Sequence, residues 1–189
     1  MRRALIVVFL VFLSLQGFSQ EKNKPLDNLY LTFNGGYHTG AGDYLPYTEV
    51  SHCSFNDGAI FSAELTGKLD NIYCGLDAQY WRHSQSISAS ESRMVKSFGA
   101  SLQLYLKHRL GIIDLYGGGG PGVCTIKEDN RHGSEDSFLY VTLKARGGAD
   151  INLSDAVAFN IDASVTGLSL LIDNMFVFSV KAGPKIRIF

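Results

Sequence analysis

A histidine, a serine and a glutamate lie close together in the segment RHGSED, at His132, Ser134 and Glu135. A serine becomes a nucleophile when a histidine within hydrogen-bond reach takes its proton and a carboxylate orients that histidine. The trio therefore has the composition of a hydrolytic site, and His83 followed by Ser84 is a second, weaker case. Both lie in polar stretches where such residues are frequent by composition alone, so we predict no catalytic residue and no enzyme.

A glycine-rich run, GGGGPG, occupies Gly117–Gly122. A glycine-rich loop can cradle a phosphate when a Lys and a Ser or Thr follow it and a helix begins there. This run lacks the Lys and the Ser or Thr, and we expect no helix after it. We interpret the glycines as positions of bulges or of close backbone approach within a β-strand, and we predict no cofactor.

Histidines and carboxylates gather in a polar stretch near the start of the chain, where they have the chemistry to bind a cation. These residues are His38, Asp43, Glu49, His52 and Asp57. Their spacing lacks the D-x-[DN]-x-[DN]-G pattern of oxygen ligands that marks a calcium loop. We therefore interpret them as solvated loop charges and predict no metal site.

The elements that would position these residues follow a two-residue period. The segment VAFNIDASV, residues 157–165, places Val, Phe, Ile, Ala and Val on one face and Ala, Asn, Asp and Ser on the other. A period of two is that of a β-strand, and charged residues opposite an apolar face favour lipid on one side and a polar enclosure on the other. Alternating segments occur at 29–37, 61–69, 72–81, 97–107, 112–124, 139–151, 157–165 and 175–189. We predict an all-β fold, an eight-stranded antiparallel up-and-down transmembrane β-barrel over residues 29–189.

The connections between these segments alternate in length. Long polar links are expected near His38–Asp57, His83–Val95, Thr125–Ser137 and Gly167–Asn174. Short links are expected near Asp70–Asn71, His108–Gly111 and Asn152–Asp155. Long extracellular loops and short periplasmic turns are typical of outer-membrane barrels.

The N-terminus has the layout of a secretory signal peptide. Arg2 and Arg3 precede an apolar run, and the small residues Gly17 and Ser19 follow it. We predict a signal peptide over residues 1–19 and a short periplasmic linker over 20–28. The whole chain has 17 basic and 18 acidic residues, so removing the two arginines leaves 15 against 18 and no basic surplus for nucleic acid.

Three cysteines, Cys53, Cys74 and Cys124, cannot all pair with one another. Export to an oxidising compartment permits one disulfide. Cys53 with Cys124 is the better pair, because both fall at the outer end of the predicted barrel. None of the cysteines has the C-x-x-C spacing of a zinc site.

Charges and aromatic residues fall on opposite parities of the predicted strands. The inward parity predicts an interior polar network of Glu64, Asp77, Asp114, Lys144, Arg146, Asp162 and Lys181. An eight-stranded barrel has an interior just wide enough to be filled by side chains, so we expect a plugged polar core and not an open pore. The outward parity predicts an aromatic girdle at the outer membrane interface, formed by Tyr37, Phe61, Tyr80, Phe98 and Phe176.

Several segments resemble a known family. A signal peptide ending FSQ, the segments IDLYGGGGPGV and LKARGGADINLSD, and the closing GPKIRIF are similar to the small outer-membrane β-barrel proteins of Bacteroidetes, the PorT-like or OmpA/OmpX-like barrels. The resemblance covers about Leu29–Phe189. It implies a monomer in outer-membrane lipid that is inserted by the barrel assembly machinery. One departure is that Phe189 falls on the charged parity, which predicts either a bulge near Gly183–Pro184 or a terminal residue beyond the bilayer edge.

These observations predict a non-enzymatic outer-membrane protein with a structural role or a surface-interaction role, in which its extracellular loops meet an unknown ligand. A narrow small-solute channel is one alternative. A membrane-embedded lipid A-type hydrolase is another, and it would need a His, a Ser and a carboxylate at the level of the acyl chains. A third is a secreted lipocalin-like barrel, whose apolar parity would face inward around a ligand.

Overall fold

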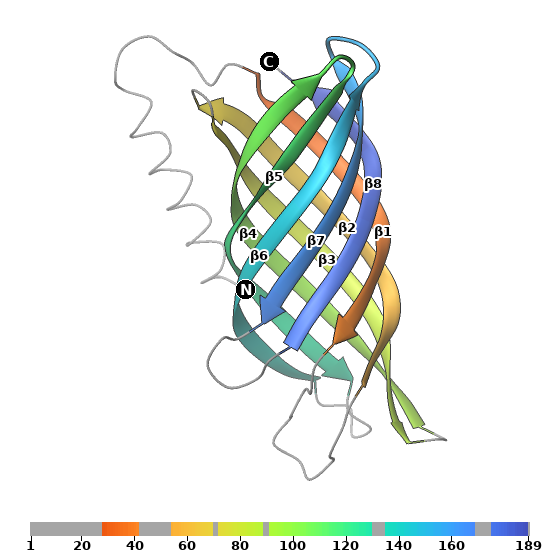
Figure 1. Ribbon diagram of the computed structural model, residues 1–189. Helices are drawn as coiled ribbons and strands as arrows, with labels where there is room; N and C mark the ends of the chain where they lie inside the picture. Colours follow the sequence, from red (N-terminus) through yellow and green to blue (C-terminus); the bar gives the residue numbers. More distant parts are fainter. Residues whose placement is uncertain are drawn as a thin grey trace.

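The computed structural model describes residues 28–41, 54–69, 72–88, 91–129, 135–168 and 175–188. Within these residues the chain forms eight β-strands (Figure 1). They are β1 (Tyr30–Ala41), β2 (Ser54–Leu69), β3 (Ile72–Ser88), β4 (Glu91–Leu110), β5 (Ile113–Asp129), β6 (Glu135–Asn152), β7 (Val157–Leu168) and β8 (Met175–Arg187). In this described part of the chain, no helix is long and apolar enough to cross a membrane.

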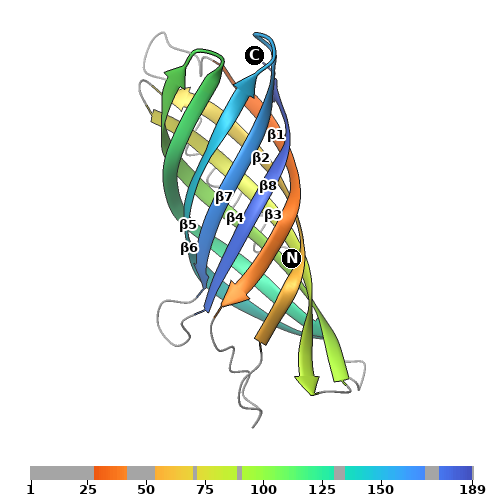
Figure 2. The same cartoon turned by 45° about the vertical axis from the view of Figure 1, so that its right-hand side comes forward.

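The strands form one closed wall. Each strand pairs in antiparallel fashion with the next, and β8 pairs with β1 to complete the barrel (Figures 1 and 2). Closure pairs the backbone groups that an open sheet would leave exposed at its edges. The predicted fold class, an eight-stranded antiparallel up-and-down barrel, is confirmed.

Some strands extend further than the sequence predicted. β3 and β4 pair as far as Ser88 and Glu91, where the sequence predicted a long link over His83–Val95. β5 and β6 likewise pair as far as Asp129 and Glu135. Figure 2 shows the β3–β4 hairpin projecting beyond its neighbours. The sequence did not predict these extensions because their residues are mostly polar and do not alternate with apolar ones. Beyond the barrel wall, two strands can stay paired through backbone hydrogen bonds without an apolar face.

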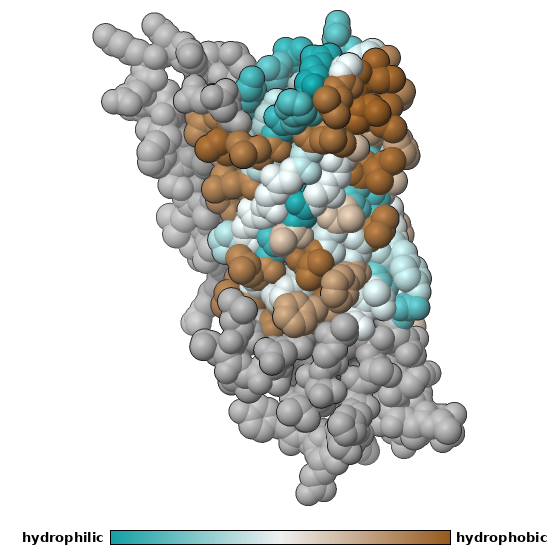
Figure 3. All heavy atoms as spheres, viewed as in Figure 1, coloured by the Kyte–Doolittle hydropathy of each residue, from teal (hydrophilic) through white to brown (hydrophobic). Residues whose placement is uncertain are grey.

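The two faces of the wall differ as the alternation predicted. In β7 every second residue from Ala158 to Leu168 is buried, and the residues between them are exposed or half-buried. Large apolar side chains such as Phe33 (48% exposed) and Leu139 (73% exposed) point outward. Figure 3 shows hydrophobic residues over the outer wall, densest towards the two ends of this face. The lipocalin-like alternative is therefore wrong, because the charged parity faces inward and the apolar parity faces outward.

The glycines of Gly117–Gly122 lie inside β5, in a strand and not in a loop. A Cβ atom at Gly118 would lie 2.1 Å from the backbone oxygen of Leu104 and 2.5 Å from the Cβ atom of Tyr105. One at Gly148 on β6 would lie 2.2 Å from the backbone oxygen of Ile161 and 2.5 Å from the hydroxyl oxygen of Tyr116. Glycine at these positions thus makes room for the backbone of the neighbouring strand and for two large side chains. The predicted close approach is confirmed, whereas β5 pairs with β4 and β6 without the predicted bulge.

β8 also runs without a shift of register. Its pairing with β7 passes evenly through Asn160 opposite Gly183 and Phe159 opposite Pro184. The bulge predicted at this point is therefore wrong. The alternative, a terminal Phe189 beyond the bilayer edge, concerns a residue outside the described part of the chain.

Candidate functional site in the barrel lumen

The barrel has two distinct ends. The turn end carries the β2–β3, β4–β5 and β6–β7 connections, together with Asn28 and Ile188. The loop end carries the β1–β2, β3–β4, β5–β6 and β7–β8 connections. In Figure 1 the turn end is at the top, beside the C-terminus.

Three basic and three acidic residues form a charged layer in the middle of the lumen. Arg146 donates from Nη1 to Glu64 Oε1 and from Nε to Asp162 Oδ2, each at 2.7 Å. Lys144 Nζ is 2.5 Å from Asp77 Oδ2. The side chains of the layer are at most 4% exposed. The full set is Arg146, Lys144, Lys181, Glu64, Asp77 and Asp162.

Arg146 is the hub of this layer. It lies on β6, and its partner Glu64 lies on β2, so their ion pair joins two strands that are not neighbours in the wall. The guanidinium carbon also lies 5.2 Å from the ring centre of Tyr116 and 5.5 Å from that of Tyr105. A buried charge is stable only when it is paired and hydrogen-bonded. The layer therefore ties the barrel together and occupies its cross-section.

A second charged group, the lysine pair, lies nearer the turn end. Lys107 and Lys185 both donate to Asp150 Oδ2, Lys185 at 2.8 Å. Asn160 Nδ2 donates to the other carboxylate oxygen at 2.7 Å. The Lys107 ammonium also lies 4.7 Å from the ring centre of Tyr73. Two cations thus share one carboxylate.

Six of the seven residues predicted for the interior network make up the charged layer. The seventh, Asp114, lies at the turn end, where its side chain is 21% exposed and its Oδ1 is 3.9 Å from Arg109 Nε. Sequence reasoning missed Asp150. The alternation of β6 could have predicted it, because Asp150 lies on the same face of this strand as Lys144 and Arg146.

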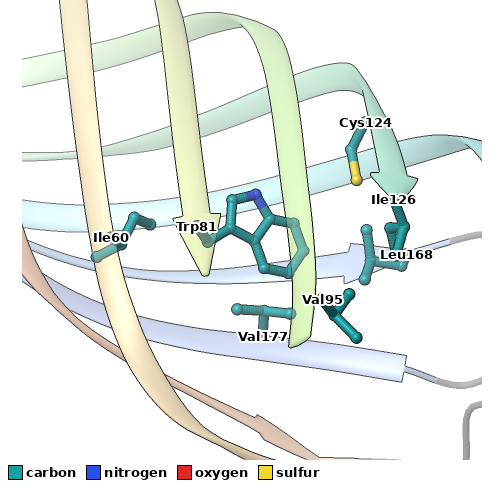
Figure 4. Packing of buried hydrophobic residues seen from close by; sticks show 7 residues of the cluster. All are labelled: Ile60, Trp81, Val95, Cys124, Ile126, Leu168 and Val177. Atoms are coloured by element: carbon teal, nitrogen blue, oxygen red, sulfur yellow. The ribbon is translucent and has the colours of Figure 1, made fainter. Parts of the chain in front are cut away.

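The loop end of the lumen is lined mainly by apolar side chains. Trp81 is 1% exposed, and the ring of His38 lies against it edge-on with the ring centres 5.7 Å apart. The predicted polar core therefore describes only the middle and the turn end, because here apolar residues occupy the inward parity. We call this set the apolar cluster (Figure 4): Ile60, Trp81, Val95, Cys124, Ile126, Leu168 and Val177.

The residues predicted to form the aromatic girdle lie on the outer wall. Phe61 pairs with Tyr80, and Tyr80 pairs with Phe98, so three aromatic residues stand side by side on β2, β3 and β4. The rings of Tyr80 and Phe98 have their centres 4.8 Å apart. Tyr37 and Phe176 are also exposed on the outer wall. Their role at a membrane interface stays a prediction.

The predicted disulfide also stays a prediction. Cys53 lies outside the described residues. Cys124 is a buried free thiol within the apolar cluster, where its Sγ is 3.3 Å from Ser97 Oγ. Cys74 is a free, half-buried thiol.

Half of the candidate catalytic and cation-binding residues lie outside the described part of the chain. This holds for His132 and Ser134, whereas Glu135 is the first residue of β6, and His83 and Ser84 belong to β3. It also holds for the loop residues Asp43, Glu49 and His52. Among the described residues, no group of three or more His, Cys, Asp and Glu side chains is placed to hold a metal ion.

The sequence matches no protein-family model and no curated protein. Among solved structures it is similar to Neisserial surface protein A, with a TM-score of 0.68 and 10% identity over 84% of this chain and 96% of that chain. It is similar to the attachment invasion locus protein Ail of Yersinia pestis in complex with the heparin analogue sucrose octasulfate, with a TM-score of 0.50 and 17% identity over 84% and 99%. The N-terminal β-barrel domain of Pseudomonas aeruginosa OprF gives a TM-score of 0.50 and 10% identity over 84% and 98%. The chain therefore has the fold of small outer-membrane β-barrels.

Proposed function

We propose that this chain is a non-enzymatic outer-membrane protein of the small Bacteroidetes barrel type, with a structural role or a contact role at the cell surface. Residues 1–19 would be the export signal and 20–28 a periplasmic linker. The turn end would face the periplasm, and the loop end would face outward. The barrel would be a monomer in lipid after insertion by the barrel assembly machinery, and it would bind no nucleic acid.

The observation that carries this proposal is the distribution of polarity across the wall. Outward residues such as Leu143 (52% exposed) and Val180 (60% exposed) are apolar, while Lys144 and Lys181 beside them in sequence are each 1% exposed. Exposing this much apolar surface to water would be unfavourable. In lipid the same surface is stable, because its charged neighbours point into the barrel. A hydrocarbon environment outside the barrel satisfies both faces.

The filling of the lumen supports a closed barrel over the channel alternative. A solute path would have to cross the charged layer, where Arg146 joins Glu64 and Asp162. It would also have to cross the apolar cluster, and apolar constrictions impede ions by excluding water. Two successive obstructions favour a role that does not depend on transport through the lumen.

A contact role would belong to the loop end. The projecting β3–β4 hairpin presents a paired backbone ribbon at this end, beyond the neighbouring strands (Figure 2). Loops carried on a rigid scaffold commonly supply binding surfaces. The likeness of fold to Ail, an attachment invasion locus protein, supports the same kind of role here.

Electrophoretic mobility tests the membrane barrel directly. We expect protein refolded in detergent micelles to give a strand spectrum in far-ultraviolet circular dichroism. We also expect it to migrate differently before and after boiling, because the closed barrel resists detergent until it is heated. Protein that is fully folded and soluble without detergent would contradict the proposal.

A further inference from the structure

A cavity of about 560 Å³ opens at the turn end of the lumen, beyond the lysine pair. The cavity is accessible from the turn end. The charged layer separates it from the apolar cluster. The ionisable residues that line it are unequal in sign. Among the described residues, four are basic and two are acidic: Lys68, Lys107, Arg109 and Arg187, against Asp114 and Asp155.

Lys107 lines the cavity and belongs to the lysine pair, which carries surplus positive charge. Asp150 Oδ2 contacts both ammonium groups of the lysine pair, and its Oδ1 already accepts a hydrogen bond from Asn160. The Lys107 and Lys185 side chains are only 8% and 5% exposed. One carboxylate therefore faces two desolvated cations, and one positive charge in this group is not compensated.

The described rim residues do not cancel the surplus charge of the lysine pair. Asp114 is engaged with Arg109 at 3.9 Å, so this acid is matched by a rim cation. Lys68 and Asp155 add one charge of each sign to the described rim. A concave site lined mainly by one sign of charge concentrates ions of the opposite sign.

The neutral groups of the cavity are suited to an oxyanion. Tyr30 and Tyr73 line it, and a phenol hydroxyl donates a hydrogen bond to an anionic oxygen. Asn152 also lines it, and its buried Nδ2 donor has no hydrogen-bond partner among the described residues. Ammonium, guanidinium, amide and hydroxyl donors together match the several acceptor oxygens of a phosphate group.

We propose that the turn-end cavity binds a phosphate group. Two sources carry this chemistry: a soluble phosphate compound that enters from the turn end, and the headgroup of an anionic phospholipid at the membrane rim. The site is separate from the loop end, so it would add a second binding function to the surface contacts proposed for the opposite end.

Phosphate binding can be measured with the full barrel reconstituted in phosphatidylcholine nanodiscs. Inorganic phosphate is titrated at constant ionic strength against sodium chloride, and its ³¹P line width is followed. In parallel, the midpoint of thermal unfolding is compared in nanodiscs with and without phosphatidylglycerol, because a ligand that binds only the folded state raises it.

Saturable broadening by inorganic phosphate would identify the soluble source. A higher midpoint in phosphatidylglycerol, without such broadening, would identify the headgroup. Either result supports the site, provided that it depends on Lys107. The absence of both effects would overturn the proposal, and so would effects that are the same in the variants described next.

Lys107→Met is the decisive variant, because it leaves Lys185 and Asp150 as a matched ion pair and removes only the surplus charge. We expect it to fold and to weaken phosphate binding by about tenfold or more, the loss that accompanies one charge-assisted hydrogen bond. Lys68→Gln at the exposed rim should weaken binding by a smaller factor. Lys127→Gln removes a cation from β5 near the loop end and should leave binding unchanged within about twofold.

Discussion

The charged layer and the apolar cluster fill the same lumen with opposite chemistry. In the charged layer each side chain depends on a particular partner, as Arg146 does on Glu64 and Asp162. In the apolar cluster Trp81 and Ile126 pack without directional bonds. Burial of a charge is favourable only with its partner present, whereas apolar packing weakens in proportion to the volume lost. The middle of the barrel should therefore tolerate few substitutions, and the loop end should tolerate many.

The largest effect is expected at the hub of the charged layer. Arg146→Met removes the partner of Glu64 and one partner of Asp162 and leaves buried carboxylates undercompensated. We expect the free energy of unfolding in micelles to fall by about 3–5 kcal/mol. Chemical denaturation followed by gel mobility measures this loss.

Arg109→Met is the matched control for that experiment. The Arg109 side chain is 75% exposed and lies 3.9 Å from Asp114, so the same chemical change should cost less than about 1 kcal/mol. Equal losses for the two arginine variants would show that the charged layer contributes no more than a surface ion pair.

A smaller effect is expected on the outer wall. Leu104 is 50% exposed on β4 and lies between the aromatic Phe98 and the turn end. Leu104→Arg places a charge in lipid and should cost about 2–4 kcal/mol in bilayers, whereas Leu104→Ile should cost less than about 1.5 kcal/mol. An arginine variant as stable as the isoleucine variant would argue against a membrane on this face.

The smallest effect is expected in the apolar cluster. Ile126→Val removes one methylene group from a residue that is 1% exposed. We expect a loss of about 0.5–1.5 kcal/mol, measured in the same unfolding assay. A loss as large as that of Arg146→Met would show that the cluster is as intolerant as the charged layer.

The sequence was sufficient to predict the wall of the barrel. Lipid outside and polar side chains inside impose opposite demands on neighbouring residues, so the alternation of β7 could be read directly. Six residues of the charged layer followed from the same parity. The pairing of Arg146 with Glu64 could not be predicted, because it depends on how β2 and β6 face each other across the lumen.

The apolar cluster and the hairpin extensions were missed for a related reason. Val95 and Ile126 are apolar residues on the inward face, which is otherwise polar. In the sequence they therefore appear to break the alternation and to mark the end of a strand. Only closure of the barrel brings them together with Trp81. Similarly, the serine-rich stretch that ends β3 lacks an apolar face, and its pairing with β4 follows from the continuation of the hairpin.

Single-molecule conductance in planar lipid bilayers tests the closed lumen most directly, with a known porin as the positive control. The charged layer and the apolar cluster predict that the inserted barrel gives no discrete current steps above the bare bilayer. Stable unitary steps from correctly folded, heat-modifiable protein would contradict the account and would make the channel alternative the better description of this protein.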